Sequence, residues 1–177
     1  MKMKEKLHKR VKVYSGNAVG FSADRIVLPD GKLATREYLE HPGAVAVIPF
    51  AKRGSIILVK QYRFPIGKIT YEIPAGKLGK DERPLSCVQR ELEEETGFKA
   101  GKIKKLLSFW PTPAFSNEIL HIYSARDLRP TRKNPDEDEF IEHIEVPFSK
   151  ALAWVRSGKI RDSKTIIALL FWQYLHY

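Results

Sequence analysis

The sequence predicts an α/β protein in which a mixed sheet is flanked by helices and preceded by a small antiparallel β unit. Short β-prone runs alternate with helical stretches along most of the chain, and there are no internal repeats. The segment His41-Pro42-Gly43 interrupts this pattern and separates a strand-rich N-terminal part from the rest. With 177 residues, 43% of them hydrophobic, the chain has room for one domain with a small appendage. We therefore expect two parts, residues 1–42 and residues 43–177.

The N-terminal part is predicted to contain three short strands. They are expected at Val11–Tyr14, Phe21–Leu28 and Leu33–Glu40, with a tight turn at Pro29-Asp30-Gly31 between the last two. The charged residues 1–12 are expected to fray. A strand-rich segment of about 30 residues is too small to bury its own apolar face. We therefore predict a homodimer built through these strands, with the aromatic last helix as a further contact.

The second part is predicted to hold the remaining strands and the helices. Two strongly β-prone runs, Ala44–Phe50 and Ser55–Tyr62, predict a central hairpin. Residues Arg126–Asp138 form the longest stretch without periodicity and are expected to be a loop. Strands are also expected at Tyr71–Ile73, Lys102–Trp110, Glu118–Ala125 and Phe140–Val146, and helices at Ser149–Ser157 and after a cap at Asp162 or Ser163.

Charge and cysteine content limit the functional classes. The net charge of +10 favours an anionic partner, but the basic residues are scattered beyond the first twelve and show no nucleic-acid-binding signature, so a nucleic-acid partner is not expected. No apolar run approaches the 18 residues of a membrane span, and the N-terminus lacks the apolar stretch of a signal peptide. The single cysteine, Cys87, fits a reducing, cytoplasmic location. We interpret it as a small buried filler in preference to a nucleophile.

One helix organises the chain. It is predicted to run from about Pro84, a residue suited to a first helical turn, to Thr96, with Gly97 as its stop. An apolar stripe along it is expected to face the core, and consists of Leu85, Val88 and Leu92.

This helix carries four carboxylates within five residues. At 100° per residue, Glu91, Glu94 and Glu95 share an arc of about 100°, whereas Glu93 points away from it. Their mutual repulsion would be relieved by a divalent cation, and oxygen-only ligands suit Mg²⁺ or Mn²⁺. For an acidic helix taken alone, a solvated charged face is the simpler interpretation.

The spacing around these carboxylates favours the metal. The segment from Gly76 to Phe98 resembles the Nudix box at every defined position. Five residues separate Gly76 from Glu82, and seven more separate Glu82 from the run Arg90-Glu91-Leu92-x-Glu94-Glu95-x-Gly97-Phe98. The resemblance implies an α/β/α sandwich and a loop–helix–loop that binds divalent metal against a diphosphate. It also implies a hydrolase of a nucleoside diphosphate linked to another moiety.

The resemblance assigns roles to the residues of the box. Glu91 and Glu95 are implied to be the principal metal ligands, and Glu94 is implied to be an auxiliary ligand or to act through water. The carbonyl of Ala75 is implied to add a further ligand, and Glu82 to assist at one metal. The same resemblance implies that Arg90 orients the carboxylates and that Gly76 provides the backbone freedom that the turn needs.

Three further residues resemble functional positions of the ADP-ribose branch of the family, although each is a weaker signal than the box. Pro113 lies fifteen residues beyond Phe98, as that branch requires, and Glu118 resembles the residue that binds the terminal ribose. Arg63 resembles a diphosphate-binding arginine, and its forked guanidinium suits phosphate oxygens. In that branch the N-terminal unit exchanges between subunits and helps to grip the adenine. Three aromatic residues, Tyr14, Phe21 and Tyr38, are candidates for that contact.

A second acidic cluster could supply a catalytic base. In the ADP-ribose branch, a glutamate on a loop closes over the substrate and acts on the attacking water. Counting back from the strand that follows, the matching position is Glu139, and Glu137 is the alternative.

The leading hypothesis is therefore Mg²⁺-dependent hydrolysis of ADP-ribose to AMP and ribose 5-phosphate. Within the enzyme class, a pyrophosphatase for GDP-mannose or another nucleotide sugar is the nearest alternative, ahead of a mutagenic-nucleotide or RNA-end hydrolase. Outside the enzyme class, the alternative is a non-catalytic nucleotide sensor or nucleic-acid-binding module on the same scaffold, which the basic composition motivates.

Overall fold

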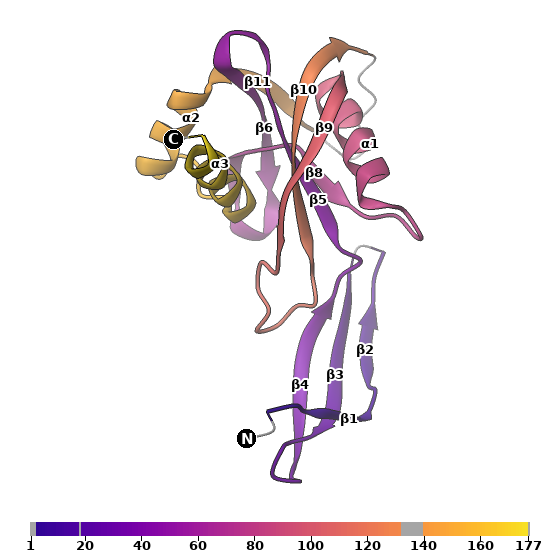
Figure 1. Cartoon of the computed structure of the whole chain (residues 1–177). Helices are drawn as coiled ribbons and strands as arrows, with labels where there is room; N and C mark the ends of the chain where they lie inside the picture. The colour runs from indigo at the N-terminus through magenta and orange to yellow at the C-terminus, as the bar shows by residue number, and fades with distance from the viewer. Residues whose placement is uncertain (1–2, 18, 132–139, 177) are drawn as a thin grey trace. The chain divides into compact units, whose positions relative to one another are not determined.

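The computed structural model describes residues 3–17, 19–131 and 140–176, and it divides into two compact units. The first unit comprises Met1–Gly43 together with Trp110–Ile119, and the second comprises Ala44–Phe109 and Leu120–Tyr177 (Figure 1). The sequence places the boundary at the same Pro-Gly break. The structure adds residues 110–119 to the first unit, because Leu39 forms a parallel bridge with Ser116.

The first unit is a four-stranded antiparallel sheet. Its central strand β3 (Gly20–Val27) pairs along its whole length with β4 (Leu33–Glu40). The other edge of β3 is shared by β1 (Lys6–Lys9) and β2 (Lys12–Ser15), each of which pairs with one half of it. The expected strands are thus present. The prediction that residues 1–12 fray is wrong for residues 6–9, which gain ladder hydrogen bonds from β3.

The second unit contains a mixed sheet in the order β8-β5-β10-β9. At its centre, β5 (Ala44–Pro49) pairs in parallel with β10 (Leu120–Pro130) and antiparallel with β8 (Ala75–Lys77). Strand β9 (Phe98–Phe109) completes the sheet next to β10. Every residue of β5 is buried, as expected for a strand that is covered on both faces.

A second, three-stranded antiparallel sheet has the order β11-β6-β7. It consists of β6 (Ser55–Arg63), β7 (Lys68–Glu72) and β11 (Glu142–Pro147), and short 3₁₀ turns precede and follow β6 at Lys52–Gly54 and Phe64–Ile66.

The predicted hairpin of the two β-prone runs is wrong. The turn between β5 and β6 sends them into different sheets, joined only by an isolated bridge between Phe50 and Ile56. Each run satisfies its backbone with strands more distant in sequence: β5 with β8 and β10, and β6 with β7 and β11.

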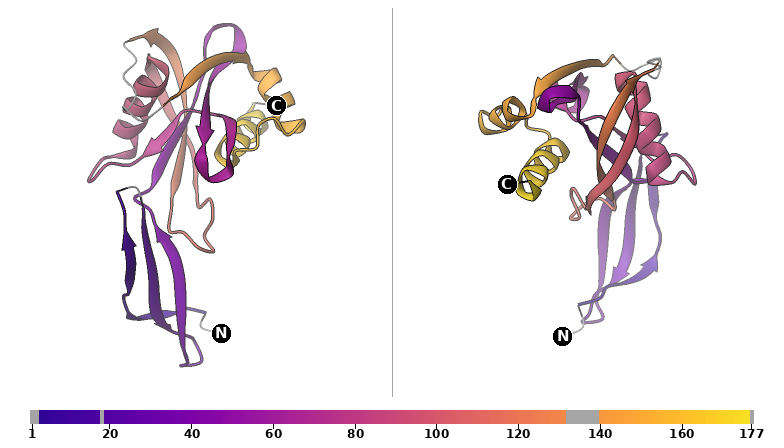
Figure 2. Two further views of the ribbon diagram at one scale, coloured as in Figure 1. Left: turned by 180° about the vertical axis from the view of Figure 1, so that it is seen from behind. Right: turned by 45° about the horizontal axis from the view of Figure 1, so that its top comes forward.

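Three helices cover the sheets. Helix α1 (Pro84–Thr96) lies on one side of the second unit, and α2 (Phe148–Arg156) and α3 (Ser163–Leu175) lie on the other side (Figures 1 and 2). Each side has its own apolar core, and β5 contributes alternate residues to both, with Val47 packed on the α1 side and Ile48 on the other. The predicted α/β sandwich with a mixed sheet is confirmed. Within the described residues, no helix is long and apolar enough to cross a membrane.

The prediction of a loop over Arg126–Asp138 is wrong for residues 126–130. Residues 126–130 continue β10 and pair with Phe98–Lys102 of β9, which supplies their hydrogen bonds. The following residues 132–139 lie outside the described part of the chain.

Candidate functional site

Helix α1 has the predicted bounds, and local chemistry explains both ends. Pro84 occupies the first helical turn, where its missing N–H is not needed. At the other end, Gly97 adopts the left-handed conformation (φ 72°) and donates its N–H to the Glu93 carbonyl at 2.9 Å. Val88 and Leu92 are fully buried, but Leu85 is 50% exposed. The predicted core stripe is therefore wrong at Leu85, in the first turn, beyond the part of the helix that packs.

The exposure of the carboxylates of α1 follows the predicted arc for Glu91 and Glu95, whereas Glu94, at 28%, is nearly as exposed as Glu93. The Glu95 side chain is buried and the Glu91 side chain is 12% exposed, whereas Glu93 lies 3.5 Å from the exposed Lys99 ammonium. A buried carboxylate requires compensating donors or cations. The buried end of the acidic face therefore consists of Glu91 and Glu95, with Glu94 at its more exposed margin.

Strand β8 lies directly against these two carboxylates. The Ala75 N–H donates to Glu95 Oε2 at 3.1 Å. A β-carbon placed on Gly76 would lie 1.9 Å from Glu91 Cδ, so only glycine leaves room for that side chain. Two successive backbone positions of β8 thus fix the surroundings of Glu91 and Glu95.

Arg90 joins the remaining box carboxylates. Its Nη1 lies 2.8 Å from Glu91 Oε1 and 2.8 Å from Glu94 Oε2, while its Nε and Nη2 each donate to Glu82 at 3.1 Å. These bonds, with a further one from the Gly79 N–H, hold the pKa of Glu82 at about 2. The same carboxylates raise the pKa of Arg90. The guanidinium therefore holds three acidic side chains in a fixed arrangement.

The donor set fits a hard divalent cation that keeps part of its water shell. Within the described ranges, no three Asp, Glu, His or Cys side chains form a ready-made metal cage. Mg²⁺ is commonly held by one or two carboxylates together with substrate phosphate oxygens, so Glu91 and Glu95 beside β8 are a sufficient protein contribution. Soft metals are disfavoured because Cys87 is buried, and burial raises the pKa of its thiol to about 12.

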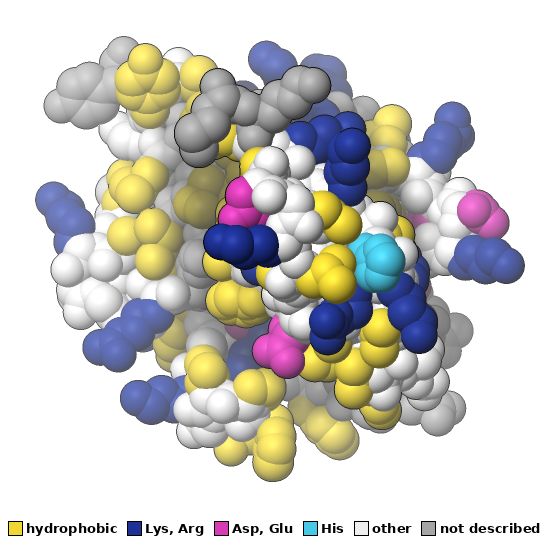
Figure 3. All heavy atoms as spheres, turned by 90° about the horizontal axis from the view of Figure 1, so that it is seen from below, with side chains coloured by type: hydrophobic (Ala, Val, Ile, Leu, Met, Phe, Trp, Pro, Cys, Tyr) yellow, Lys and Arg dark blue, Asp and Glu magenta, His cyan; other side chains and the backbone are white. Residues whose placement is uncertain are grey.

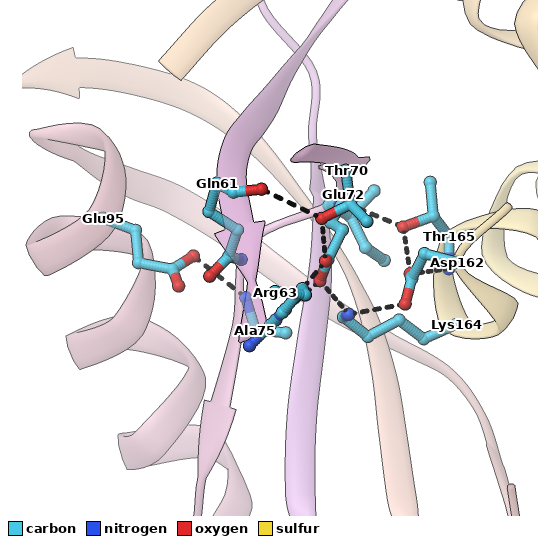
Figure 4. Close-up of polar contacts among 10 residues, drawn as sticks. Gln61, Arg63, Thr70, Glu72, Ala75, Glu95, Asp162, Lys164 and Thr165 are labelled. Atoms are coloured by element: carbon cyan, nitrogen blue, oxygen red, sulfur yellow. Dashed lines mark hydrogen bonds and ion pairs between the residues drawn. The ribbon is translucent and has the colours of Figure 1, made fainter. Parts of the chain in front are cut away.

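A second charged cluster lies at the ends of β6 and β7 and was not predicted from the sequence (Figure 4). The Glu72 side chain is 2% exposed and accepts two hydrogen bonds from Arg63, Nε to Oε1 at 2.9 Å and Nη2 to Oε2 at 2.7 Å. Thr70 donates to Oε1 at 2.5 Å, and the Lys164 ammonium at the start of α3 donates to Oε2. Burial alone would raise the pKa of Glu72, but these donors outweigh it and bring the pKa to about 2.

A sequence signal for this cluster exists in strand β7, where Thr70 and Glu72 alternate with Ile69 and Tyr71. The spacing of two positions between Gln61 and Arg63 on β6 matches that between Thr70 and Glu72, although β6 itself shows no polar alternation at Lys60-Gln61-Tyr62-Arg63. Because side chains alternate between faces along a strand, these four residues share one face of the paired strands. Lys164 could not be found in this way, because it reaches Glu72 from 92 positions away in sequence.

The other predicted substrate residues lie elsewhere in the chain. Pro113 and Glu118 belong to the first unit, where the Glu118 carboxylate is 4.0 Å from His41 Nδ1 and Pro113 is exposed. Glu137 and Glu139 lie outside the described residues.

In Figure 3, the Lys and Arg side chains of the described residues are interspersed with hydrophobic and uncharged side chains.

Comparisons with known proteins show which family and which relatives the chain is similar to. The model of the NUDIX domain family matches residues 40–169. The chain is 43% identical over 171 residues to the methanol dehydrogenase activator of Bacillus methanolicus, covering 96% of this chain and 92% of that protein. It is 41% identical over 173 residues to the ADP-ribose pyrophosphatase of Bacillus subtilis strain 168, covering 97% and 94%. A crystal structure of an ADP compounds hydrolase superposes with a TM-score of 0.85, covering 97% of this chain and 94% of that one. At 19% identity, this match shows the fold alone.

Proposed function

The chain belongs to the Nudix hydrolase family, and we propose that it hydrolyses the diphosphate of ADP-ribose to AMP and ribose 5-phosphate with Mg²⁺. The observation that carries this proposal is the pair of shielded carboxylates, Glu91 and Glu95, held against the backbone of β8. A diphosphate resists attack by water because its oxygens are negatively charged. When bound, Mg²⁺ or Mn²⁺ supplies the positive charge that offsets this repulsion and orients the phosphates.

The side chains of the site are assigned to metal binding, orientation of the ligands and binding of the diphosphate. Glu91 and Glu95 are assigned as the principal ligands, and Glu94, Glu82 and the Ala75 carbonyl as supporting ones. Arg90 orients Glu91, Glu94 and Glu82 through its ion pairs and hydrogen bonds, and Arg63 is assigned to the diphosphate oxygens.

In the chemical step, the oxygen of a water molecule bonds to one phosphorus. The bond from that phosphorus to the bridging oxygen breaks, and the bridging oxygen leaves with the other phosphate. Glu139, or Glu137 in the alternative register, is assigned to accept the proton of the attacking water.

The substrate assignment rests on Arg63, Pro113 and Glu118 as marks of the ADP-ribose branch and on the relative from B. subtilis. It is tested by incubating the purified protein and Mg²⁺ with ADP-ribose, GDP-mannose and other nucleotide sugars and identifying the products by chromatography. AMP and ribose 5-phosphate in equal amounts are expected. Preferential cleavage of GDP-mannose would replace ADP-ribose as the substrate, and cleavage of none would remove the hydrolase function.

A second candidate function comes from the relative in B. methanolicus, whose name describes activation of a methanol dehydrogenase. The hydrolase is preferred because a protein that acts only by contact has no need of the complete carboxylate set of α1. Glu95→Gln separates the two functions. If activation of a dehydrogenase depends on hydrolysis, the Glu95→Gln variant should not activate it. If activation depends on contact alone, the variant should still activate it.

We also assign the molecule to a homodimer in the reducing cytoplasm. The single, fully buried Cys87 supports the compartment. Support for the dimer comes from the first unit, whose sheet leaves Leu7, Val13, Tyr14 and Leu33 between 53% and 62% exposed.

A further inference from the structure

The position of Lys164 is unusual for a lysine. It lies in the first turn of α3, where a cation is disfavoured by the helix dipole, and its side chain is only 14% exposed. The same turn is already capped, because the Asp162 side chain accepts the Thr165 N–H at 2.9 Å. The stability of the helix therefore does not explain a buried cation at this position.

The contacts of Lys164 lead to a residue assigned to the substrate. Its ammonium donates to Glu72 Oε2 and to Asp162 Oδ1, the latter at 2.9 Å. Glu72 in turn accepts both Nε and Nη2 of Arg63. Figure 4 shows the three side chains meeting at the Glu72 carboxylate, with Arg63 on the side of Ala75.

The Arg63 guanidinium binds Glu72 through one edge, formed by Nε and Nη2, and presents its other edge, at Nη1, away from this ion pair. Among the residues that the structure describes, its Nη1 has no hydrogen-bond partner, and its side chain is 43% exposed. The hydrogen bond to Glu72 is the main cause of the raised pKa of Arg63, and the charge of Glu95 adds a smaller contribution. Figure 4 shows Arg63 beside Ala75, whose N–H donates to Glu95 Oε2. The open edge of Arg63 is thus available to an anion beside that site.

The charges in this cluster explain why a second cation is needed. Glu72 is buried and ionised, and with Arg63 as its only cation it would hold that guanidinium as a tight ion pair. Lys164 supplies a second positive charge to the same carboxylate, and its removal would leave Glu72 and Asp162 with one uncompensated negative charge beside Arg63, which would weaken the attraction of Arg63 for an added phosphate. Asp162 balances Lys164 in turn, and the four side chains carry no net charge.

We propose that Lys164 is a positioning residue for substrate binding, acting through Glu72 to hold Arg63 with its free edge toward the diphosphate. This inference rests on the proposed function for the identity of the anion. Among the described residues, the Lys164 ammonium donates hydrogen bonds to Glu72 and Asp162, and we assign it no contact with substrate. Its effect should therefore appear in the binding of substrate and depend on Arg63.

The test is a double-mutant cycle between Lys164 and Arg63. Lys164→Met is expected to raise the KM for ADP-ribose about tenfold while kcat stays within about threefold, as for loss of a charged hydrogen-bonded contact. Arg63→Met should raise KM at least as much. The double variant should match Arg63→Met alone, because a residue that acts through Arg63 has no effect once Arg63 is gone. Lys164→Arg, which keeps the charge, should stay within about threefold of the wild type.

Lys159→Met is the matched control. The Lys159 ammonium lies 3.6 Å from the centre of the Trp154 ring, so its loss removes a structural contact from the same region without touching Glu72. It should lower the melting temperature and leave KM unchanged. Where Lys164→Met does not fold, Lys164→Gln removes the charge and keeps a hydrogen-bond donor.

The inference is overturned if the KM effects of Lys164→Met and Arg63→Met multiply, or if Lys164→Met only lowers the melting temperature. Calorimetric binding of inorganic pyrophosphate to the same metal-free variants gives a readout that needs no turnover. Weakened, non-additive pyrophosphate binding with no hydrolysis of any nucleotide sugar would support the role of Lys164 and reject the proposed function. Normal hydrolysis with an unmoved KM would reject the role of Lys164 alone.

Discussion

Glu91 occupies the space that a side chain on residue 76 would need. A β-carbon on Gly76 would lie 1.9 Å from Glu91 Cδ and 2.3 Å from Oε2, far inside van der Waals contact. Gly76 pairs with Val45 in the middle of the β8 ladder, so its backbone has little freedom to withdraw. The glycine of the box therefore sets where the Glu91 carboxylate can lie.

Gly76→Ala should displace Glu91 and weaken the metal site. We expect at least a tenfold rise in the Mg²⁺ concentration for half-maximal activity, because one of the two buried carboxylates is moved. A metal titration of activity measures this. Gly79→Ala is the comparison variant, since its β-carbon would approach only the flexible end of Glu82, at 3.2 Å, and it should shift the titration less. Equal titrations for the wild type and Gly76→Ala would contradict the placement of Glu91 at the metal.

Glu95→Gln should abolish most of the turnover and leave the fold intact. The Glu95 carboxylate is buried and accepts the Ala75 N–H at 3.1 Å, a bond that the glutamine carbonyl oxygen can keep. The substitution also removes one of three like charges on the helix face. We expect a loss in kcat of at least about 100-fold, with a melting temperature close to that of the wild type. A folded variant with near-normal turnover at saturating Mg²⁺ would show that Glu95 is not a ligand.

Glu72 should make the stability of the protein depend on pH in the acid range. Its pKa falls from 4.5 to about 2 on folding, so its contribution is complete above pH 4.5 and declines as the pH falls toward 2. For a buried group, this shift corresponds to about 3 kcal/mol. Urea unfolding followed by circular dichroism at pH 7, 5, 4 and 3 measures the effect.

Glu72→Gln is the corresponding variant. It should be less stable at pH 7, because Arg63 and Lys164 lose their shared carboxylate. Its free energy of unfolding should fall less steeply between pH 4.5 and 2 than that of the wild type. Glu82, whose pKa is also lowered to about 2, contributes to the slope of both proteins. Parallel slopes would show that Glu72 is not ionised by its partners in the folded state.

Local chemistry made parts of the fold predictable. Helix α1 has the predicted bounds because Pro84 and Gly97 mark its ends by backbone chemistry alone. The cap of α3 at Asp162 follows the same rule. The pairing of β5 and β6 was predicted wrongly, because runs that are buried on both faces carry no alternation to indicate their partners.

In the candidate site too, features set by local sequence were predictable and contacts between distant segments were not. The spacing of Glu91 and Glu95 on one helix places them together without further information. Contacts between distant segments were not predictable, and Lys164, which meets Glu72 from α3, is the example. A lysine in the first turn of a helix is indistinguishable in sequence from a surface charge, because its burial depends on how the helix packs.

The first unit should mediate a homodimer. The buried face of β3 is polar, with Ser22 and Asp24 hydrogen-bonded to Glu40 and Tyr38. Apolar side chains such as Val13, 60% exposed, are left on its surface. Sedimentation velocity at micromolar concentration should give twice the mass of the chain, and Val13→Glu should shift the population toward monomer. A wild-type monomer at this concentration would remove both the dimer and an adenine site shared between subunits.

Glu139 should act in the chemical step, although it lies outside the described residues. It directly follows the sequence stretch Arg126–Asp138, in the position that matches the loop glutamate of the ADP-ribose branch. Such a residue contributes to the transition state and little to substrate affinity. Glu139→Gln should therefore lower kcat about 10²–10⁴-fold with a small change in KM. Steady-state kinetics of ADP-ribose hydrolysis measure both constants.

Glu137→Gln is the matched control, with the same change in charge two residues away. A large loss in Glu137→Gln with normal turnover in Glu139→Gln would shift the assignment by two residues. Normal turnover in both variants would exclude these carboxylates from the chemical step.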